Sequence, residues 1–511
     1  MMEKISLLFW PGRPQRRYQW VSRHDGKTVV LCDLSLCPLC NLSERENLRN
    51  VKGSLGLEVQ LELRRSYGGI GIASRERYIG HLVSRSKAEV TKVIPRVIPE
   101  VTPEPEGAEI DIACNVVLCQ SQGMSLLIDP GAIGFDGKGE EIVERLVRGR
   151  SVAGVLLTHG HNDHYNGLAG LGRKRPPIFM TSPTQQIILS RQELEKATLL
   201  SLVRRAELIT PGQPPVLEIG PFKVSTFSLS HSIPGTMGLF IRGSKRMMVY
   251  LGDFKFCGFD SRPMAQTVAT LREIAKESVD ILAINIVNAH LEGFTPIEAL
   301  TIETITNVLA RAKGRVIVTC FSSNLERIRR IVEVAQLLKR PVAFHGAGMR
   351  HSQELLGIKT EEGATESKEA VIFVTGCQAE ENSVLWRIAT RQNLPFELWS
   401  SDTLVLSSRG IPGKETDLSP LTTNLRPRVD RLIVHRGEVE QLGLKGLGVE
   451  EMLTHISGHE YGGGLQLVLE TLKPKKVLAW PQTEPQFSAF RKIAEPLGIE
   501  ILSEKERVIE I

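Results

Sequence analysis

The sequence predicts an α/β protein in which helices cover stacked β-sheets. Amphipathic patterns of helical period occur at residues 140–148, 184–197 and 199–206, and apolar runs of strand type occur at residues 126–128 and 155–157. Alternation of this kind is typical of layered α/β folds rather than of all-α or all-β proteins. We therefore expect an α/β sandwich with its helices on the outside.

The length and composition are those of a multidomain globular protein. A chain of 511 residues corresponds to about three domains. A hydrophobic content of 41% with 24% charged residues is sufficient for sizeable cores. The apolar runs are all shorter than the roughly 20 residues that span a membrane, and residues 5–10 are too short for a secretory signal. We expect a cytoplasmic protein with no membrane partner.

The net positive charge is concentrated near the N-terminus. Residues 1–106 contain 17 Lys and Arg residues and 12 Asp and Glu residues, so they account for the whole net charge of +5. Between Trp10 and Arg23, aromatic residues alternate with arginines, a pattern found on surfaces that stack nucleic-acid bases. An ordinary solvated surface with a few anchoring aromatic side chains explains the pattern equally well.

The cysteines do not form a disulfide framework. The chain has 8 cysteines scattered along its length, which fits reduced thiols. Cys32, Cys37 and Cys40 lie close together, and the Cys-Pro-x-Cys turn that ends this group is typical of a structural zinc knuckle, with His24 as a candidate fourth ligand. The alternative is that these cysteines are small buried apolar residues.

A proline-rich segment separates the N-terminal residues from the rest of the chain. Four prolines between residues 95 and 105 are interspersed with Val and Glu, a composition typical of an extended linker. Alternating apolar residues at 57–63, followed by glycines at 68–71, indicate a small β-rich domain before this linker. We therefore place a separate small domain and its linker in residues 1–106.

The strongest functional signal is a cluster of metal-ligand residue types directly after the apolar run 155–157. His159, His161, Asp163 and His164 occur within six residues. Imidazole and carboxylate groups are ligands that zinc prefers, and four of them at the end of one strand can serve two adjacent ions. Three of the chain's 12 histidines fall in these six positions, which disfavours an ordinary polar loop.

This HxHxDH pattern resembles the metallo-β-lactamase superfamily. Other segments resemble motifs of that superfamily in the expected order: Leu-Leu-Ile-Asp ending at Asp129, Ser-His-Ser-Ile-Pro around His231, and Leu-Gly-Asp ending at Asp253. The resemblance implies an αββα sandwich. It also implies that Asp129 orients the histidine cluster, that His231 is a ligand and that Asp253 bridges two metal ions.

Roughly 200 residues follow Asp253 before the next candidate ligand, too many for a loop, so a domain must be inserted there. The inserted segments resemble the β-CASP domain of nucleases, and most closely that of the ribonuclease J group. The resemblance rests on NIVNA with GFTP (285–296), TCFSSN with two arginines (319–330), TGCQAE (375–380), SSRGIPGKE (407–415) and THISGH (454–459). It implies a catalytic domain at residues 107–295 and 451–511, with an α/β β-CASP domain at 296–450.

The resemblance to ribonuclease J also implies a metal-ligand set. One ion would be held by His159, His161 and His231, a second ion by Asp163, His164 and His459, and Asp253 would lie between them. The expected cofactors are two divalent cations, Zn²⁺ first, with Mn²⁺ or Mg²⁺ as alternatives, which activate a water molecule for attack on a phosphodiester. Asp163, Asp253 and His459 are then the candidate catalytic residues.

A phosphate-binding group is implied in the same way. By resemblance, Ser323, His455 and Ser457 hold the phosphate of the terminal nucleotide. Ser and Gly turns at strand ends supply hydroxyl and backbone N–H donors that suit a phosphate. Ser323 is also in a position to cap the helix that starts near Leu325.

Two positions depart from the ribonuclease J pattern. Asn285 stands where relatives have an aspartate, and an amide carries no charge with which to orient and polarise a ligand histidine. Gln482, or Pro481 in a shifted register, stands where ribonuclease J relatives usually have a histidine that contacts the scissile phosphate. Such a histidine contributes on the order of 10²-fold to the rate if it is a general acid. We therefore expect slow or specialised cleavage.

The sequence thus predicts a metal-dependent ribonuclease that cleaves single-stranded RNA from its 5′ end, internally, or both. The alternative is a catalytically weak or inactive paralogue that binds RNA, which the substitutions at Asn285 and Gln482 favour. A DNA nuclease of the same superfamily is a third hypothesis. Homodimerisation is an expectation that rests on the resemblance alone.

Overall fold

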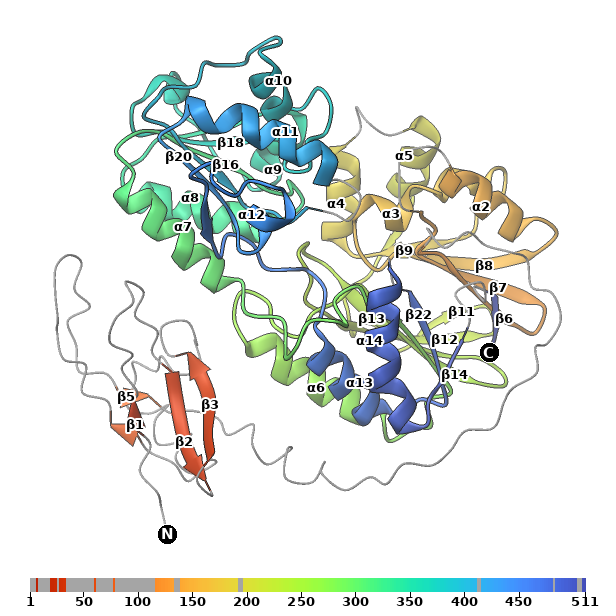
Figure 1. Cartoon of the computed structure of the whole chain (residues 1–511). Helices are drawn as coiled ribbons and strands as arrows, with labels where there is room; N and C mark the ends of the chain where they lie inside the picture. The colour runs from red at the N-terminus through yellow and green to blue at the C-terminus, as the bar shows by residue number, and fades with distance from the viewer. Residues whose placement is uncertain are drawn as a thin grey trace. The chain divides into compact units, whose positions relative to one another are not determined.

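The computed structural model describes residues 115–132, 138–191, 196–410, 415–480, 483–502 and 508–511, together with five short strands near the N-terminus (Figure 1). These strands form a three-stranded antiparallel sheet and a separate pair: β1 (Ser6–Leu7), β2 (Gln19–His24), β3 (Lys27–Asp33), β4 (Val59–Gln60) and β5 (Arg77–Tyr78). A separate N-terminal domain stays a prediction. So does the zinc knuckle, because Cys37, Cys40 and the side chain of Cys32 lie outside the described residues.

Two mixed sheets form the layers of a sandwich. The first has the order β10-β9-β8-β7-β6-β24 and consists of β6 (Val117–Ser121), β7 (Met124–Ile128), β8 (Ser151–Leu156), β9 (Ile178–Met180), β10 (Glu207–Leu208) and β24 (Val508–Glu510). The second has the order β11-β12-β13-β14-β15-β22-β23 and consists of β11 (Leu217–Ile219), β12 (Phe222–Ser228), β13 (Met237–Arg242), β14 (Met247–Gly252), β15 (Ile281–Asn285), β22 (Lys476–Trp480) and β23 (Glu500–Ile501).

Alternation along the strands builds the layers, because successive side chains point to opposite faces of a sheet. Val117 and Leu126 belong to the buried cluster between the two sheets, whereas Leu118 and Leu127 pack beneath the outer helices. The first sheet is covered by α2 (Lys138–Val147), α5 (Ala197–Arg204) and η3 (Leu168–Leu171), and the second by α6 (Arg262–Ile274), α13 (Gly462–Leu472) and α14 (Glu484–Ala494) (Figure 1). The predicted αββα sandwich is confirmed.

The inserted domain lies between two strands that are neighbours in the second sheet. Strands β15 and β22 pair in parallel although the whole insert separates them in sequence. The insert has its own parallel sheet of order β17-β18-β16-β19-β20-β21: β16 (Val316–Thr319), β17 (Val342–His345), β18 (Val371–Val374), β19 (Thr403–Leu406), β20 (Arg431–His435) and β21 (Glu450–Met452). The predicted α/β insert is confirmed, while its boundaries at residues 295/296 and 450/451 stay predictions.

Helices cover both faces of the inserted sheet. One face packs against α7 (Ala299–Arg311), α8 (Leu325–Leu337) and α9 (Ala347–Leu355), and the other against α10 (Val384–Thr390) and α11 (Glu415–Leu425). A short helix, α12 (Glu438–Gln441), follows β20. Because all six strands are parallel, their carboxyl ends share one edge, which is where open α/β sheets bind ligands.

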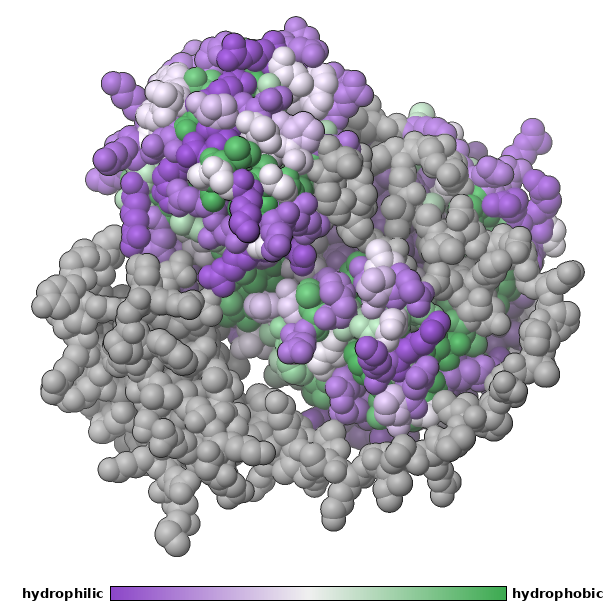
Figure 2. Space-filling model, in the orientation of Figure 1, coloured by the Kyte–Doolittle hydropathy of each residue, from purple (hydrophilic) through white to green (hydrophobic). Residues whose placement is uncertain are grey.

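The helix expected at residues 184–197 differs from the observed one. Helix α4 (Ser182–Ser190) starts earlier because Thr181 caps it by accepting a hydrogen bond from the Thr184 amide, and the helix ends at Ser190. None of the helices in the described part of the chain is long and apolar enough to cross a bilayer. Figure 2 shows a mainly hydrophilic described surface on the visible face, with only small apolar areas.

Candidate metal centre

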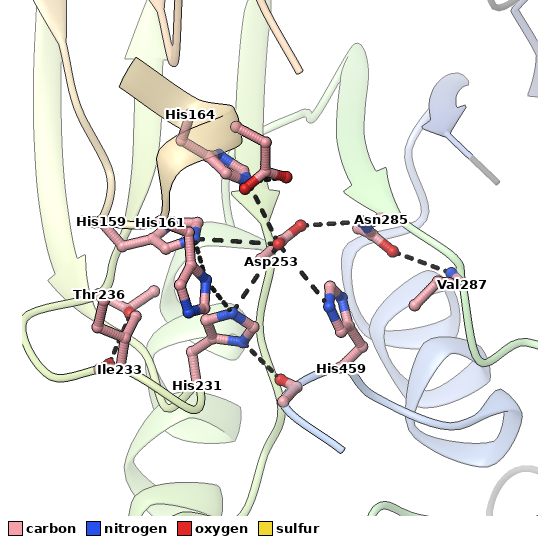
Figure 3. A network of polar contacts seen from close by, with 12 residues as sticks. His159, His161, His164, His231, Ile233, Thr236, Asp253, Asn285, Val287 and His459 are labelled. Carbon is pink, nitrogen blue, oxygen red and sulfur yellow. Dashed lines mark hydrogen bonds and ion pairs between the residues drawn. The ribbon is translucent and has the colours of Figure 1, made fainter. Parts of the chain in front are cut away.

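The candidate ligands come from four segments of the chain that meet at one edge of the sandwich (Figure 3). His159 and His161 follow β8, and the short helix α3 (Asn162–Tyr165) carries Asp163 and His164. The chain can bring α3 this close to the loop after β7 only because residue 131 is glycine: a Cβ atom there would lie 2.3 Å from the Asp163 carbonyl oxygen. Local backbone packing therefore positions the first four candidate ligands.

Asp253 lies at the centre of the group. Its Oδ2 atom is 3.2 Å from Nε2 of His164 and 3.9 Å from Nε2 of His159, His231 and His459. The Asp253 side chain is only 5% exposed. One carboxylate oxygen therefore faces four imidazole rings contributed by segments far apart in the sequence, as a bridging ligand requires.

Three histidines form one candidate position, which we call the three-histidine position (His159, His161 and His231). Nδ1 of His161 lies 3.1 Å from Nε2 of His159 and 3.1 Å from Nε2 of His231. Together with an Asp253 oxygen, these ligand atoms all lie within 4.8 Å of one another. Ligands of a tetrahedral zinc ion with Zn–N distances of about 2.0–2.1 Å are separated by about 3.3 Å, so the spacing fits.

The other nitrogen of each of these rings is already hydrogen-bonded. His159 Nδ1 contacts Thr158 Oγ1 at 3.1 Å, His161 Nε2 contacts Ser323 Oγ at 3.2 Å, and His231 Nδ1 donates to the Gly458 carbonyl at 2.7 Å. Each ring therefore directs one lone pair at the same point. Converging lone pairs repel one another unless a cation lies between them, so the residues present fit a divalent cation.

Asp163, His164 and His459 are the candidate ligands of a second cation, and we call this set the mixed position. His164 Nε2 lies 3.7 Å from Asp163 Oδ2. His164 Nδ1 donates to Asp129 Oδ2 at 3.0 Å, so its Nε2 atom faces the site. The Nδ1 atom of His459 is buried and has no hydrogen-bond partner among the described residues. The mixed position is thus less completely supported than the three-histidine position.

Asp129 supports both positions from behind. Its carboxylate accepts hydrogen bonds from the Thr158 amide (2.7 Å), the Thr158 hydroxyl (2.6 Å), the Tyr250 hydroxyl (2.8 Å) and His164. Asp129 is fully buried and has a φ of 43°, a strained value for a residue other than glycine. This agrees with the supporting role implied by the sequence. Thr158 and Tyr250 were not predicted, because no motif marks them.

Burial and neighbouring charges shift the pKa values of these groups. Burial lowers the pKa of His159 and His161 well below the ordinary value, and nearby imidazoles lower it further, so both rings are neutral lone-pair donors. Burial alone would raise the pKa of Asp253, but His459, His164 and His231 outweigh it and lower that pKa, which keeps the carboxylate ionised.

Asn285 does not contact a histidine, contrary to the role that its position suggested. Its amide nitrogen donates to Asp253 Oδ1 at 2.9 Å, and its own oxygen accepts from the Val287 amide at 2.9 Å (Figure 3). Asn285 therefore holds the bridging carboxylate itself. Gln482 lies outside the described residues.

The three candidate phosphate-binding residues lie beside the metal centre or behind it. Ser323 does not cap α8, because Asn324 does so by accepting from the Arg327 amide at 3.1 Å. Ser323 instead contacts His161 across the domain boundary. The Ser457 hydroxyl oxygen accepts from Asn288 (2.8 Å) and from the His459 amide (3.1 Å), which leaves its hydrogen available to an anion.

His455 is held by a buried arginine. Arg327 is fully buried, and its guanidinium contacts His455 Nδ1 at 3.0 Å and donates to the carbonyl oxygens of Ser407 (2.8 Å) and Ile456 (3.1 Å). Because His455 Nδ1 accepts this bond, its Nε2 carries the hydrogen and can donate. Burial, followed by Arg327, lowers the pKa of His455 well below its ordinary value, so the ring is a neutral donor.

The matches with protein families agree with the fold and the site. Residues 125–269 match the beta-lactamase superfamily domain, and residues 313–425 match the ribonuclease J beta-CASP domain. The crystal structure of a protein of unknown function from Enterococcus faecalis V583 has a TM-score of 0.50 at 14% identity, covering 77% of this chain and 95% of that one, which indicates a shared fold. The class defined by fold and site is therefore a metallo-β-lactamase sandwich with a β-CASP insert.

Within that class, the chain is similar in sequence to proteins named ribonuclease J. Ribonuclease J of Sinorhizobium meliloti is 30% identical over 342 residues, which cover 64% of this chain and 57% of that protein. Ribonuclease J of Thermus thermophilus is 28% identical over 77% of this chain and 70% of its own length, and ribonuclease J2 of Bacillus subtilis is 28% identical over 79% and 74%. The chain thus spans between about half and three quarters of these relatives.

Proposed function

We propose that this chain is a metal-dependent ribonuclease that hydrolyses phosphodiester bonds of single-stranded RNA. The observation that carries the proposal is the arrangement around Asp253, where one buried carboxylate oxygen faces four imidazoles. The second support is Ser323, through which the insert contacts a candidate ligand histidine. The similarity to proteins named ribonuclease J, and the match of residues 313–425 to the ribonuclease J beta-CASP domain, also support the proposal.

The cofactors proposed are two divalent cations, with Zn²⁺ first and Mn²⁺ or Mg²⁺ as alternatives. His159, His161 and His231 would hold one, and Asp163, His164 and His459 the other, with Asp253 shared. When bound, such cations lower the pKa of a coordinated water and offset negative charge that develops on the phosphate. Imidazole-rich ligand sets favour zinc over magnesium.

The side chains of this site have distinct tasks in the proposed reaction. Asp163 is 36% exposed, against 5% for Asp253 and 0% for Asp129, so it is the carboxylate that solvent and substrate can reach. It would orient the attacking water and accept its proton. Three groups would donate hydrogen bonds to the terminal phosphate of the RNA: the hydroxyls of Ser323 and Ser457 and the Nε2–H of His455. Recognition of a 5′-terminal phosphate favours cleavage that starts at the 5′ end.

A catalytically weak RNA-binding protein is the second candidate function. It is favoured by His459, whose Nδ1 atom has no hydrogen-bond partner among the described residues. Ligand histidines normally donate that hydrogen to an acceptor, and loss of such a partner costs about 10–100-fold in metal affinity or activity. The cytoplasmic location and homodimerisation predicted from the sequence remain proposals.

A cleavage assay separates the two functions. The substrate is one single-stranded RNA, labelled at its 3′ end and prepared in two forms, with a 5′-monophosphate or with a 5′-triphosphate. Each form of the RNA is incubated with the protein in the presence of Zn²⁺ or Mn²⁺. We expect cation-dependent loss of RNA that prefers the 5′-monophosphate and disappears in Asp163→Ala. RNA that is bound but degraded no faster than by Asp163→Ala would support the binding function and reject the nuclease.

A further inference from the structure

Asn115 contacts two candidate ligands of the mixed position. It lies two residues before the start of β6, and its amide nitrogen lies 2.8 Å from Asp163 Oδ2 and 3.1 Å from His164 Nε2. The same nitrogen also donates to the Asp163 backbone carbonyl at 3.1 Å. Asn115 itself is only 3% exposed, so its surroundings hold the side chain in place.

The contacts decide how the Asp163 carboxylate is held. An amide nitrogen has hydrogens to donate and no lone pair for a cation, so Asn115 cannot itself be a ligand. Asp163 is more exposed than the other carboxylates, and a free aspartate would rotate about its side-chain bonds. Two hydrogen bonds from one fixed nitrogen, to the backbone and to the side chain of Asp163, remove that freedom.

Within the described part of the chain, His459 differs from the other candidate ligand histidines in its hydrogen bonding. His159, His161, His231 and His164 each have a hydrogen-bond partner on the nitrogen that faces away from the site, whereas His459 Nδ1 has none among the described residues. With one of its three ligands unsupported, the mixed position depends more strongly on the support of the other two. Asn115 supplies that support to Asp163, from a position 48 residues earlier in the chain.

We propose that Asn115 is a positioning residue that sets the cation affinity of the mixed position without affecting the three-histidine position. This inference rests on the proposed two-cation function. Outer hydrogen-bond partners of ligands typically contribute 10–100-fold to metal affinity. Removing the Asn115 amide therefore weakens the binding of a cation at the mixed position by about 10–100-fold. The affinity of the three-histidine position stays unchanged.

The test is a Zn²⁺ titration of the full chain without RNA, by competition with a chromophoric chelator, which yields two dissociation constants. Wild type is compared with Asn115→Ala and with Asn166→Ala. Asn166 is a matched control, because its amide donates to the Ala132 carbonyl (2.8 Å) and accepts from the Ala132 amide (2.9 Å) beside the same short helix.

The expected result is a 10–100-fold rise in the weaker dissociation constant for Asn115→Ala only, with RNA cleavage restored by excess cation. Equal weakening of both constants, or no change in either, would overturn the inference while leaving the nuclease intact. A wild-type chain that binds no second cation would overturn the inference together with the two-cation site. Urea unfolding of each variant identifies any that fails to fold.

Discussion

Asn285 donates its side-chain amide to Oδ1 of Asp253 at 2.9 Å, while Oδ2 of the same carboxylate faces the candidate metal ligands. The two oxygens of Asp253 thus have different tasks. One is fixed by a neutral donor, and only the other is available to cations. An aspartate at position 285 would place a second negative charge against the first, whereas the asparagine satisfies Asp253 without adding charge.

Replacing Asn285 should change stability in a way that depends on cations. Asn285→Asp brings two carboxylates together, so without cations one must take up a proton, and we expect a loss of about 1–3 kcal/mol in the free energy of unfolding. Added Zn²⁺ should reduce that loss because positive charge offsets the repulsion. Urea denaturation in EDTA and in Zn²⁺ measures both values. A variant as stable as wild type in EDTA would contradict the assignment.

The buried ion-pair network that joins the two domains predicts a large stability effect. Arg327 pairs with Glu298, and Lys255 Nζ lies 3.5 Å from the same carboxylate, with all three side chains at most 5% exposed. Glu298→Gln leaves two buried cations without their counter-charge, which should cost about 3–5 kcal/mol. Chemical denaturation monitored by circular dichroism measures the loss.

An exposed ion pair provides the control for that experiment. Glu326 pairs with Arg329 and Arg330 on the surface of α8, where the side chains are 31–45% exposed. Glu326→Gln should therefore cost at most about 1 kcal/mol. An equal loss of unfolding free energy in Glu298→Gln and Glu326→Gln would show that the buried network stabilises the fold no more than a surface ion pair does.

His435 predicts a pH dependence of stability. Burial, then Arg409 and Arg327, lowers its pKa from 6.5 to about 4. A neutral ring is thus favoured in the folded state, so its stabilising contribution is fully present above about pH 6.5 and is lost as pH falls toward 4. His435 Nδ1 accepts from the His455 amide at 3.2 Å, an acceptor role that Asn can keep without titrating. His435→Asn should therefore lose less stability than wild type between pH 6.5 and 4, by thermal denaturation. Parallel loss in both proteins would contradict the assignment.

The sequence predicted those parts of the fold and site that have a local signal. The αββα layers follow from alternating apolar residues such as Leu126 and Leu127, which pack on opposite faces of one strand. His159, His161, Asp163 and His164 could be found because one strand end and one short helix carry all four. The insert could be inferred from the long interval after Asp253, since no compact loop has that length.

Contacts between distant segments could not be predicted, because the partner of a polar side chain depends on packing. Nothing in the sequence pairs Asn115 with Asp163, which lie 48 residues apart, or Arg327 with His455, which lie 128 apart. The partner of Asn285 could not be identified from the sequence for the same reason. Its amide contacts Asp253 because β14 and β15 are parallel neighbours that end together.

The most direct test of the central claim compares RNA hydrolysis by wild type and Asp253→Asn, each treated with EDTA and then resupplied with Zn²⁺ or Mn²⁺. Asn keeps the size of the side chain but removes the negative charge that would be shared by the two proposed cations. We expect wild-type cleavage to stop in EDTA and to return with the cation. We expect Asp253→Asn to cleave more than about 10²-fold more slowly while still binding RNA by fluorescence anisotropy. Cleavage that survives chelation, or that Asp253→Asn retains at the wild-type rate, would contradict the account.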